Sequence, residues 1–271
     1  MVPSYRKNHG KKRCGVKKST RILLIIVLSL ALIVISVPKW FSFNSYNYDN
    51  AGRYTAGGSV IAQKVERIAV DWIAGEVTIE QHSGDEIILS ETASRKLKQQ
   101  EQVHWLVDGD TLYVKYVRAG RNYSTRLDKE LTLVLPDSLN LEEIVISGVS
   151  ADIQADLSDA ERVCVQNVSG DTHMILGRTG ALRVENVSGN VTLSCQNVPG
   201  SIDVNTVSGH ATVLLPETAE FTATLDSVSG RIGGQLLEGV ADAESFTRGN
   251  GGCDIHMNSV SGSLQLDACE R

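Results

Sequence analysis

Aromatic side chains are scarce in this chain. Phe, Trp and Tyr together make up 5% of its 271 residues, and few Trp or Tyr fall at outward positions of the segments that resemble strands. An enzyme that acts on sugar polymers uses exposed aromatic rings for stacking, so this scarcity counts against one. The sequence also has no phosphate-binding loop, nucleophile elbow or Ser-His-Asp motif. We therefore predict no catalytic residues and no cofactor.

Acidic residues are missing from residues 1–21, which carry eight Lys and Arg residues. The rest of the chain reverses this balance, with 18 bases against 32 acids. Because nucleic-acid binding needs a basic face, the acidic main body excludes nucleic acid as a partner. A hydrophobic share of 42% excludes a wholly disordered chain.

The sequence has a single long hydrophobic run, residues 22–37, in which two serines are the only polar residues. Sixteen helical residues span about 24 Å, slightly less than a hydrocarbon core of about 30 Å. Trp40 and Phe41 follow and are suited to the far interface. We predict a transmembrane helix over residues 22–41.

The residues on either side of the predicted span indicate its orientation and that it is not cleaved. Eight bases keep residues 1–21 as a cytoplasmic tail, which places the bulk of a single-pass cell-membrane protein outside the cytoplasm. A cleavable signal peptide is the alternative, but residues 37–40 (VPKW) match a small-residue cleavage site poorly. Residues 42–59 are rich in Asn, Ser, Gly and Tyr, and we interpret them as a linker.

From residue 60 onward the pattern is that of strands. Short runs such as 66–71 (ERIAVD) and 111–116 (TLYVKY) alternate apolar and polar residues and are rich in β-branched side chains. Only residues 93–102 have a helical composition, and they are polar on every side, which favours a loop or a single turn. We predict an all-β extracytoplasmic domain over residues 60–269.

An internal repeat is the strongest signal. Val-Ser-Gly occurs at 168–170, 187–189, 207–209, 228–230 and 260–262. Counted from a Val-Ser-Ala variant at 149–151, the spacings are 19, 19, 20, 21 and 32 residues. Apolar pairs precede each triplet and follow most of them, the last following pair one position out of register. Period-two alternation puts each pair on one face of a strand.

A unit of about 20 residues cannot bury its own apolar face, whereas stacked units can. We therefore predict a single-stranded β-solenoid, resembling a β-helix, with aliphatic rows along its axis. Residues 239–252 are expected to loop out of one coil. The turns would be formed by glycines that adopt backbone conformations costly for other residues: Gly170, Gly189, Gly209, Gly230 and Gly262. The polar residues before the turns would form ladders from coil to coil, beginning at Asn167 and Asn186.

Residues 60–268 resemble the putative-adhesin family of bacterial cell-surface domains, which includes LiaG-like proteins. The matching motifs lie at 68–79, 108–114 (DGDTLYV), 131–136 (LTLVLP), 141–153 (LEEIVISGVSADI) and the serial Val-Ser-Gly turns. The resemblance implies a right-handed β-solenoid-like domain, often membrane-anchored in Gram-positive bacteria. It links such domains to adhesion or envelope stress without an agreed biochemical function, and it supplies no catalytic residues.

Cysteines and histidines give few candidate sites. Cys164 is expected to face solvent and Cys195 the core, so they should not pair. Cys253 and Cys269 are 16 residues apart, close to one coil, and a disulfide between them would clip the open end of the stack. Free thiols are the alternative. The six histidines share no metal-ligand spacing, so no metal site is predicted.

Acidic residues cluster at Asp152, Asp156, Asp159, Glu161 and Asp171. Asp152 and Asp171 occupy the same place in successive repeats, which would put them about 5 Å apart. Such a pair would suit a hydrolase or a cation, whereas the structural alternative is a solvated acidic rim.

We predict a non-enzymatic, membrane-anchored surface protein whose solenoid meets a cell-wall polymer or another envelope protein. Two alternatives stay open. One is a carbohydrate-active β-helix enzyme that uses the acids near Asp152 and Asp171. The other is a membrane sensor or regulatory subunit whose basic tail contacts a cytoplasmic partner.

Overall fold

The computed structural model describes residues 41–269 except 43–44, 63, 122–126 and 238–243. Within these residues no helix has the length and apolar character needed to cross a membrane. The predicted span at 22–41 lies outside them apart from Phe41. That residue belongs to the two-residue strand β1 (Phe41–Ser42), which pairs with β2 (Ser45–Tyr46), so strand pairing has begun where the sequence suggested the end of a helix.

The described chain is all-β, as predicted, with three single-turn 3-10 helices: η2 (Ala51–Arg53), η3 (Gln99–Glu101) and η4 (Gln235–Leu237). η3 lies in the polar segment expected to form a loop or a turn. Seventeen strands form one continuous sheet: β3 (Thr55–Ala56), β4 (Ser59–Ile61), β5 (Arg67–His82), β6 (Ile87–Ala93), β7 (His104–Asp108), β8 (Thr111–Lys115), β9 (Lys129–Pro136), β10 (Leu141–Ser169), β11 (Thr172–Ser188), β12 (Val191–Cys195), β13 (Ser201–Ser208), β14 (Ala211–Leu215), β15 (Phe221–Ser227), β16 (Ile232–Gly233), β17 (Ser245–Arg248), β18 (Cys253–Ser261) and β19 (Leu264–Ala268).

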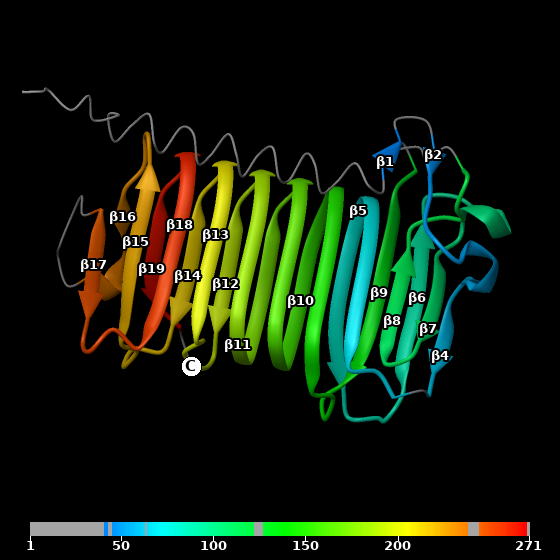
Figure 1. Cartoon of the computed structure of the whole chain (residues 1–271), viewed down its shortest axis with the longest axis horizontal. Helices are drawn as coiled ribbons and strands as arrows, with labels where there is room; N and C mark the ends of the chain where they lie inside the picture. The colour runs from blue at the N-terminus through cyan, green and yellow to red at the C-terminus, as the bar shows by residue number, and fades with distance from the viewer. Residues whose placement is uncertain (1–40, 43–44, 63, 122–126, 238–243, 270–271) are drawn as a thin grey trace, which may run out of the picture.

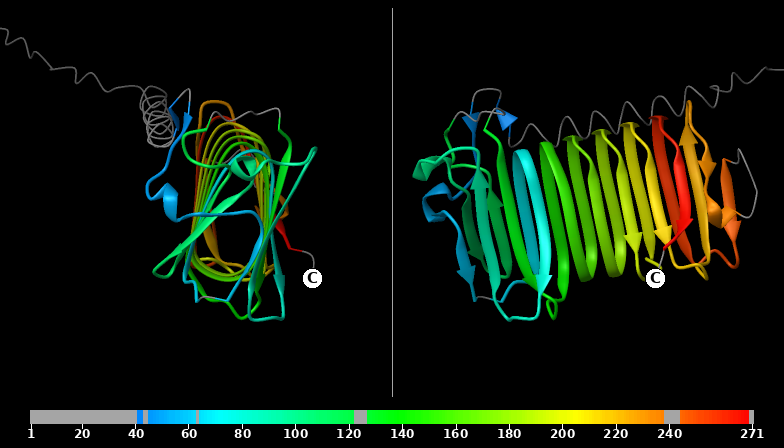
Figure 2. Two further views of the ribbon diagram at one scale, coloured as in Figure 1. Left: turned by 90° about the vertical axis from the view of Figure 1, so that its right-hand side faces the viewer. Right: turned by 180° about the vertical axis from the view of Figure 1, so that it is seen from behind.

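This sheet winds into the flattened solenoid of Figure 1, and the end-on view in Figure 2 shows its two facing walls. Long strands such as β10 and β11 bend at a corner and contribute to both walls. Parallel pairing joins most neighbouring coils, whereas the end that carries β3, β4, β6 and β7 is antiparallel. The predicted solenoid is therefore present, with an irregular unit at its N-terminal end.

The core consists of aliphatic rows, one from each wall. On one wall the row is in register from coil to coil and buried throughout: Val163, Leu182, Ile202, Ile255 and Ala223. On the other wall the corresponding buried row is Met174, Leu193, Val213 and Leu266. Burying each larger side chain contributes roughly 1.5–3 kcal/mol, so these rows hold the coils together.

The order of the coils differs from their order in the sequence. β18 lies between β13 and β15, and β19 lies between β14 and β16. The fifth Val-Ser-Gly unit is thus inserted between the third and the fourth, as Figure 1 shows for the red strand β18 beside the yellow β13. The sequence-based expectation of a sequential stack is wrong at this end, because coils with equivalent edges can pair in either order.

The expected loop at 239–252 also differs. Its described part includes β17, which pairs antiparallel with β15 and so covers the outer edge of that strand. The extra residues therefore allow the chain to reverse and re-enter the stack. The last unit is in normal register too, since Leu264 pairs with Ala211 and Leu266 with Val213.

The corner glycines mark the same spatial order. A Cβ on Gly189 would collide with the carbonyl oxygen of Gly170, and one on Gly209 with that of Gly189. The next contact runs from Gly262 to the Gly209 oxygen, and the last from Gly230 to the Gly262 oxygen. Successive corners are therefore stacked too closely for any side chain at these positions.

Polar side chains next to these corners form a row along the solenoid in which all members but Ser227 are buried. The register aligns Asn167, Asn186, Thr206, Ser259 and Ser227. Asn167 Nδ2 donates to the Ala151 carbonyl at 2.7 Å, and Asn186 Nδ2 donates to the carbonyls of Gly170 and Gly189. The two asparagines of the expected ladder thus satisfy corner carbonyls, whereas the buried hydroxyls of Thr206 and Ser259 have no hydrogen-bond partner among the described residues.

Tyrosines of the predicted linker 42–59 pack against the domain. Tyr46 is 1% exposed, and its backbone N–H donates to the Arg121 carbonyl at 3.0 Å. The Tyr48 ring contacts both Tyr46 and Tyr54, with centroids 5.6 and 4.7 Å apart. The Asn, Ser and Gly content suggested a free tether, but tyrosine rings bury large apolar surfaces and decide the outcome. The packed domain therefore begins near Tyr46.

Candidate functional site

The acids proposed as a catalytic pair bind backbone instead. Asp152 Oδ1 accepts a hydrogen bond from the N–H of Asp171 at 2.9 Å, and Asp171 Oδ1 accepts one from the N–H of Asn190 at 2.7 Å. The same contact is repeated by Asn190, His210 and Ser263 along the stack. These side chains join successive corners, which supports the structural interpretation of the acidic pair.

The four described cysteines are free thiols. Cys195 faces the core and Cys164 the outside, as expected. Burial raises the pKa of Cys195 to about 12 and that of Cys253 to about 11, which keeps both protonated at neutral pH. Cys269 Sγ lies 3.4 Å from Ser194 Oγ. The proposed clip between Cys253 and Cys269 is not formed, and their coil lies inside the stack rather than at its open end.

A groove crosses the corners opposite the Val-Ser-Gly turns and has a volume of about 950 Å³. Ala62 and residues from 64–66, 136–142, 159–161, 178–180 and 197–198 line it, together with Asp85 and Ile87. Val65, Ile87, Pro136 and Ala160 supply buried apolar surface, and Val198 is 40% exposed. Because each segment belongs to a different turn of the chain, the groove exists only in the folded stack.

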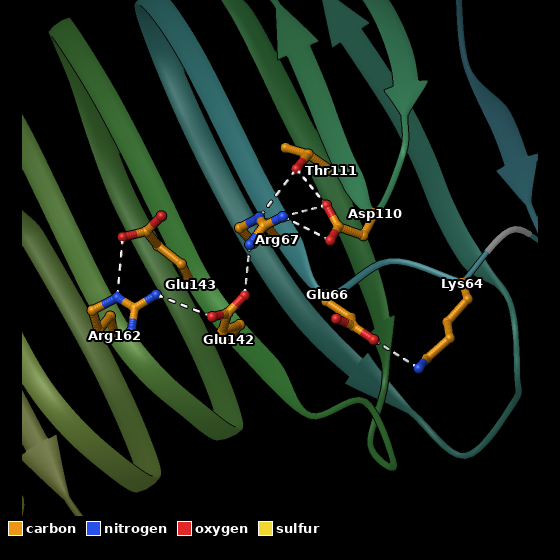
Figure 3. Close-up of polar contacts among 8 residues, drawn as sticks. All are labelled: Lys64, Glu66, Arg67, Asp110, Thr111, Glu142, Glu143 and Arg162. Carbon is orange, nitrogen blue, oxygen red and sulfur yellow. Dashed lines mark hydrogen bonds and ion pairs between the residues drawn. The ribbon is translucent and has the colours of Figure 1, made fainter.

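A network of charges (Figure 3) includes three residues that line the groove, Lys64, Glu66 and Glu142. Lys64 Nζ lies 2.7 Å from Glu66, and Arg67 binds both Asp110 at 2.6 Å and Glu142 at 2.7 Å. Arg162 extends the network to Glu142 and Glu143. Hydrogen bonds from Arg67 and Thr111 lower the pKa of Asp110. Exposed pairs of this kind each contribute about 0–1 kcal/mol, so the network orders side chains more than it stabilises the fold.

The groove carries both paired and unpaired carboxylates. Asp159 is held by two hydrogen bonds from Arg178, at 2.7 and 2.8 Å, and this partner lowers the pKa of Asp159. Asp85 and Glu161 are exposed, and their carboxylates make no hydrogen bond or ion pair with any residue that the structure describes. Two carboxylates are therefore free to bind cationic or hydrogen-bond-donating groups.

Sequence reasoning did not find this groove. It placed Asp159 and Glu161 in an acidic cluster, but it did not connect them to residues 62–66 or to Asp85. The turn residues between repeats carry no recurring motif, so the spacing of the corners was the only available signal. In the described part of the chain no three His, Cys, Asp or Glu side chains come together to hold a metal ion.

A known protein family matches most of this chain. The family model described as Toastrack DUF4097 matches residues 65–175 and 137–267. No match was found among curated proteins.

Two solved structures resemble the chain. A putative cell adhesion protein from Clostridium sporogenes is 14% identical with a TM-score of 0.47, and the match covers 79% of this chain and 100% of that one. A putative adhesin from Bacteroides fragilis is 12% identical with a TM-score of 0.44, and the match covers 78% and 97%. The resemblance to putative adhesins is confirmed, and the chain belongs to the Toastrack DUF4097 family.

Proposed function

We propose that this protein is a non-enzymatic, membrane-anchored surface module whose groove binds a cell-wall polymer or another envelope protein. The observation that carries the proposal is the groove across successive corners, with Asp85 and Glu161 available to a partner. Glu161 lies in strand β10 and Asp85 in the short turn between β5 and β6 of the same sheet, so little ordering is needed on binding.

Charge indicates the chemistry of the partner. Residues 130–271 contain 20 acids and six bases. Among the residues lining the groove, the carboxylates outnumber Lys64 and Arg178. A polymer or protein that presents amino groups and hydroxyl donors is therefore a suitable partner, whereas a polyanion is repelled.

The anchor is the predicted transmembrane helix at 22–41. The packed domain starts near Tyr46, which pairs with Phe41 in the β1–β2 hairpin, so the domain begins directly beside the end of the predicted span. The solenoid would therefore lie close to the outer face of the cell membrane, and its N-terminal end would be nearest to that face. Alkaline carbonate extraction of membranes that contain the full chain tests the anchor, and release into the soluble fraction would contradict it.

The groove is tested by binding of the full chain, purified in neutral detergent, to isolated cell-wall material. Asp85→Asn combined with Glu161→Gln should weaken retention. Asp156→Asn combined with Asp254→Asn removes the same charge from exposed sites outside the groove and should leave retention unchanged. Equal retention of both double variants would contradict the groove assignment, and release of sugar fragments would favour the hydrolase alternative.

A further inference from the structure

We propose that a second cavity, at the N-terminal end of the solenoid, binds the phosphate headgroup of an anionic membrane lipid. The cavity has a volume of about 300 Å³ and lies between η2 and η3. Its polar lining includes Tyr54, Lys98, Gln99, His104 and Arg118. The inference rests on the membrane anchor of the proposed function and concerns a different surface from the groove.

The lining of this cavity suits an anion. It includes two cationic side chains, two amides, an imidazole and a phenol, but no carboxylate. Lys98 and Arg118 are exposed and form no ion pair with any described residue. The nearby Glu101 is engaged by both terminal nitrogens of Arg95, at 2.9 and 3.0 Å. Arginine binds phosphate oxygens through a planar fork and lysine acts as a point charge, so the pair matches a phosphate group.

His104 lines the cavity and lies near two cationic side chains, Lys129 and Arg118. The side chain is 5% exposed, and its Nδ1 lies 2.9 Å from the Gln102 carbonyl. Burial lowers the pKa of His104, and the nearby charges of Lys129 and Arg118 lower it further. A bound anion would offset this repulsion, because an opposite charge favours the protonated form.

The position of the cavity identifies the source of the phosphate. The segment that supplies Arg118 also contacts the start of the domain, because the Gly120 N–H donates a hydrogen bond to the Tyr46 carbonyl at 2.7 Å. Tyr46 is five residues beyond the predicted span, so the chain keeps this end near the headgroups. Arg121 and Lys96 are exposed at the same end.

The distribution of charge agrees with this orientation. Residues 46–129 contain 11 bases and 12 acids, whereas residues 130–271 contain six bases and 20 acids. Anionic lipids attract cations near the surface and repel carboxylates. The nearly neutral end with unpaired cations can therefore approach an anionic membrane, while the acidic remainder is held away from it.

Native mass spectrometry of the full chain in neutral detergent tests the site. Phosphatidylglycerol should bind more tightly than phosphatidylcholine, and inorganic phosphate should compete. Lys98→Gln combined with Arg118→Gln removes two cationic donors to the phosphate oxygens, so binding should weaken at least tenfold. Arg183→Gln combined with Arg231→Gln removes the same charge from exposed sites outside both cavities and should bind like the unaltered chain.

Each other result has a distinct meaning. Unchanged lipid binding by the Lys98/Arg118 variant, with an unchanged melting temperature, would overturn the site. Binding of inorganic phosphate without any preference for phosphatidylglycerol would overturn the lipid assignment and indicate a free anion. Phosphate competition is measured in detergent and does not need the anchor, so failure in carbonate extraction would overturn the anchor alone.

Discussion

The middle of the solenoid and its C-terminal end use the same coil but different connections. Between β10 and β14 each coil pairs with the next one in the sequence. Beyond β14 the chain first forms the outer coil of β15 and β16, and then returns to place β18 and β19 beneath it. The comparison shows that the repeat specifies the shape of a coil but does not specify which other coil it pairs with.

The physical reason lies in the coil edges. Every coil presents a row of backbone donors and acceptors, a glycine corner and an aliphatic row, so different coils offer nearly equivalent partners. The outer coil is distinguished by what covers it: β17 pairs along β15, and Leu236 and Leu237 are buried beside it. Covering the last edge in this way protects an open sheet from pairing with other chains.

Removing the inserted coil should have the largest effect. Truncation after Gly252 deletes six buried side chains, among them four large apolar ones, Ile255, Met257, Leu264 and Leu266, which contribute about 1.5–3 kcal/mol each. That loss is comparable with the whole stability of a typical domain, about 5–15 kcal/mol. Hydrogen exchange should show lost protection in β13, β14 and β15. Truncation after Ala268 is the control, and protected β15 amides in the shorter chain would contradict the insertion.

A single methyl group at the inserted corner should have the next largest effect. Gly262→Ala places a Cβ against the Gly209 carbonyl oxygen and should lower the free energy of unfolding by about 1–3 kcal/mol. Gly233→Ala meets no atom within 4 Å and should change it by less than about 0.5 kcal/mol. Denaturant unfolding compares the two, and equal stabilities would mean that the corner of the last unit is open.

The buried polar row that begins at Asn167 should contribute more to stability in the middle of the solenoid than at its C-terminal end. Asn186→Ala removes donors to two corner carbonyls and should cost about 1–2 kcal/mol. The buried Ser259 hydroxyl has no hydrogen-bond partner among the described residues, so Ser259→Ala should be close to neutral. Thermal unfolding of both variants measures the difference, and a larger loss for Ser259→Ala would contradict these partner assignments.

The side chains that join successive corners, from Asp152 to Ser263, should give the smallest effects, and these should be equal in the middle and at the C-terminal end. Asp171→Ala removes the acceptor for the Asn190 N–H, and Ser263→Ala removes the acceptor for the Arg231 N–H. Each should cost about 0.5–1 kcal/mol by denaturant unfolding. A neutral Ser263→Ala would argue that the ladder stops before the outer coil.

Sequence patterns account for the coils and much less for what surrounds them. Strand alternation and the glycine spacing predicted the solenoid, the inward rows and the alignment of Asp152 with Asp171. They did not predict the position of the last coil, because equivalent edges carry no order. They also did not predict the packing of Tyr46 and Tyr48, since a few large rings outweighed a linker-like composition. The groove escaped notice because its segments meet only after folding.

Cross-linking at the outer serines tests the inserted coil most directly. Ser208 is in register with Ser261, at a parallel-strand spacing of about 4.8 Å, which a disulfide can bridge. Ser229 lies one strand further away. The full chain with Ser208→Cys and Ser261→Cys should form this disulfide under mild oxidation, as read by mass mapping, while Ser208→Cys with Ser229→Cys should not. Efficient linkage of 208 to 229, with none to 261, would contradict the insertion and restore a sequential stack.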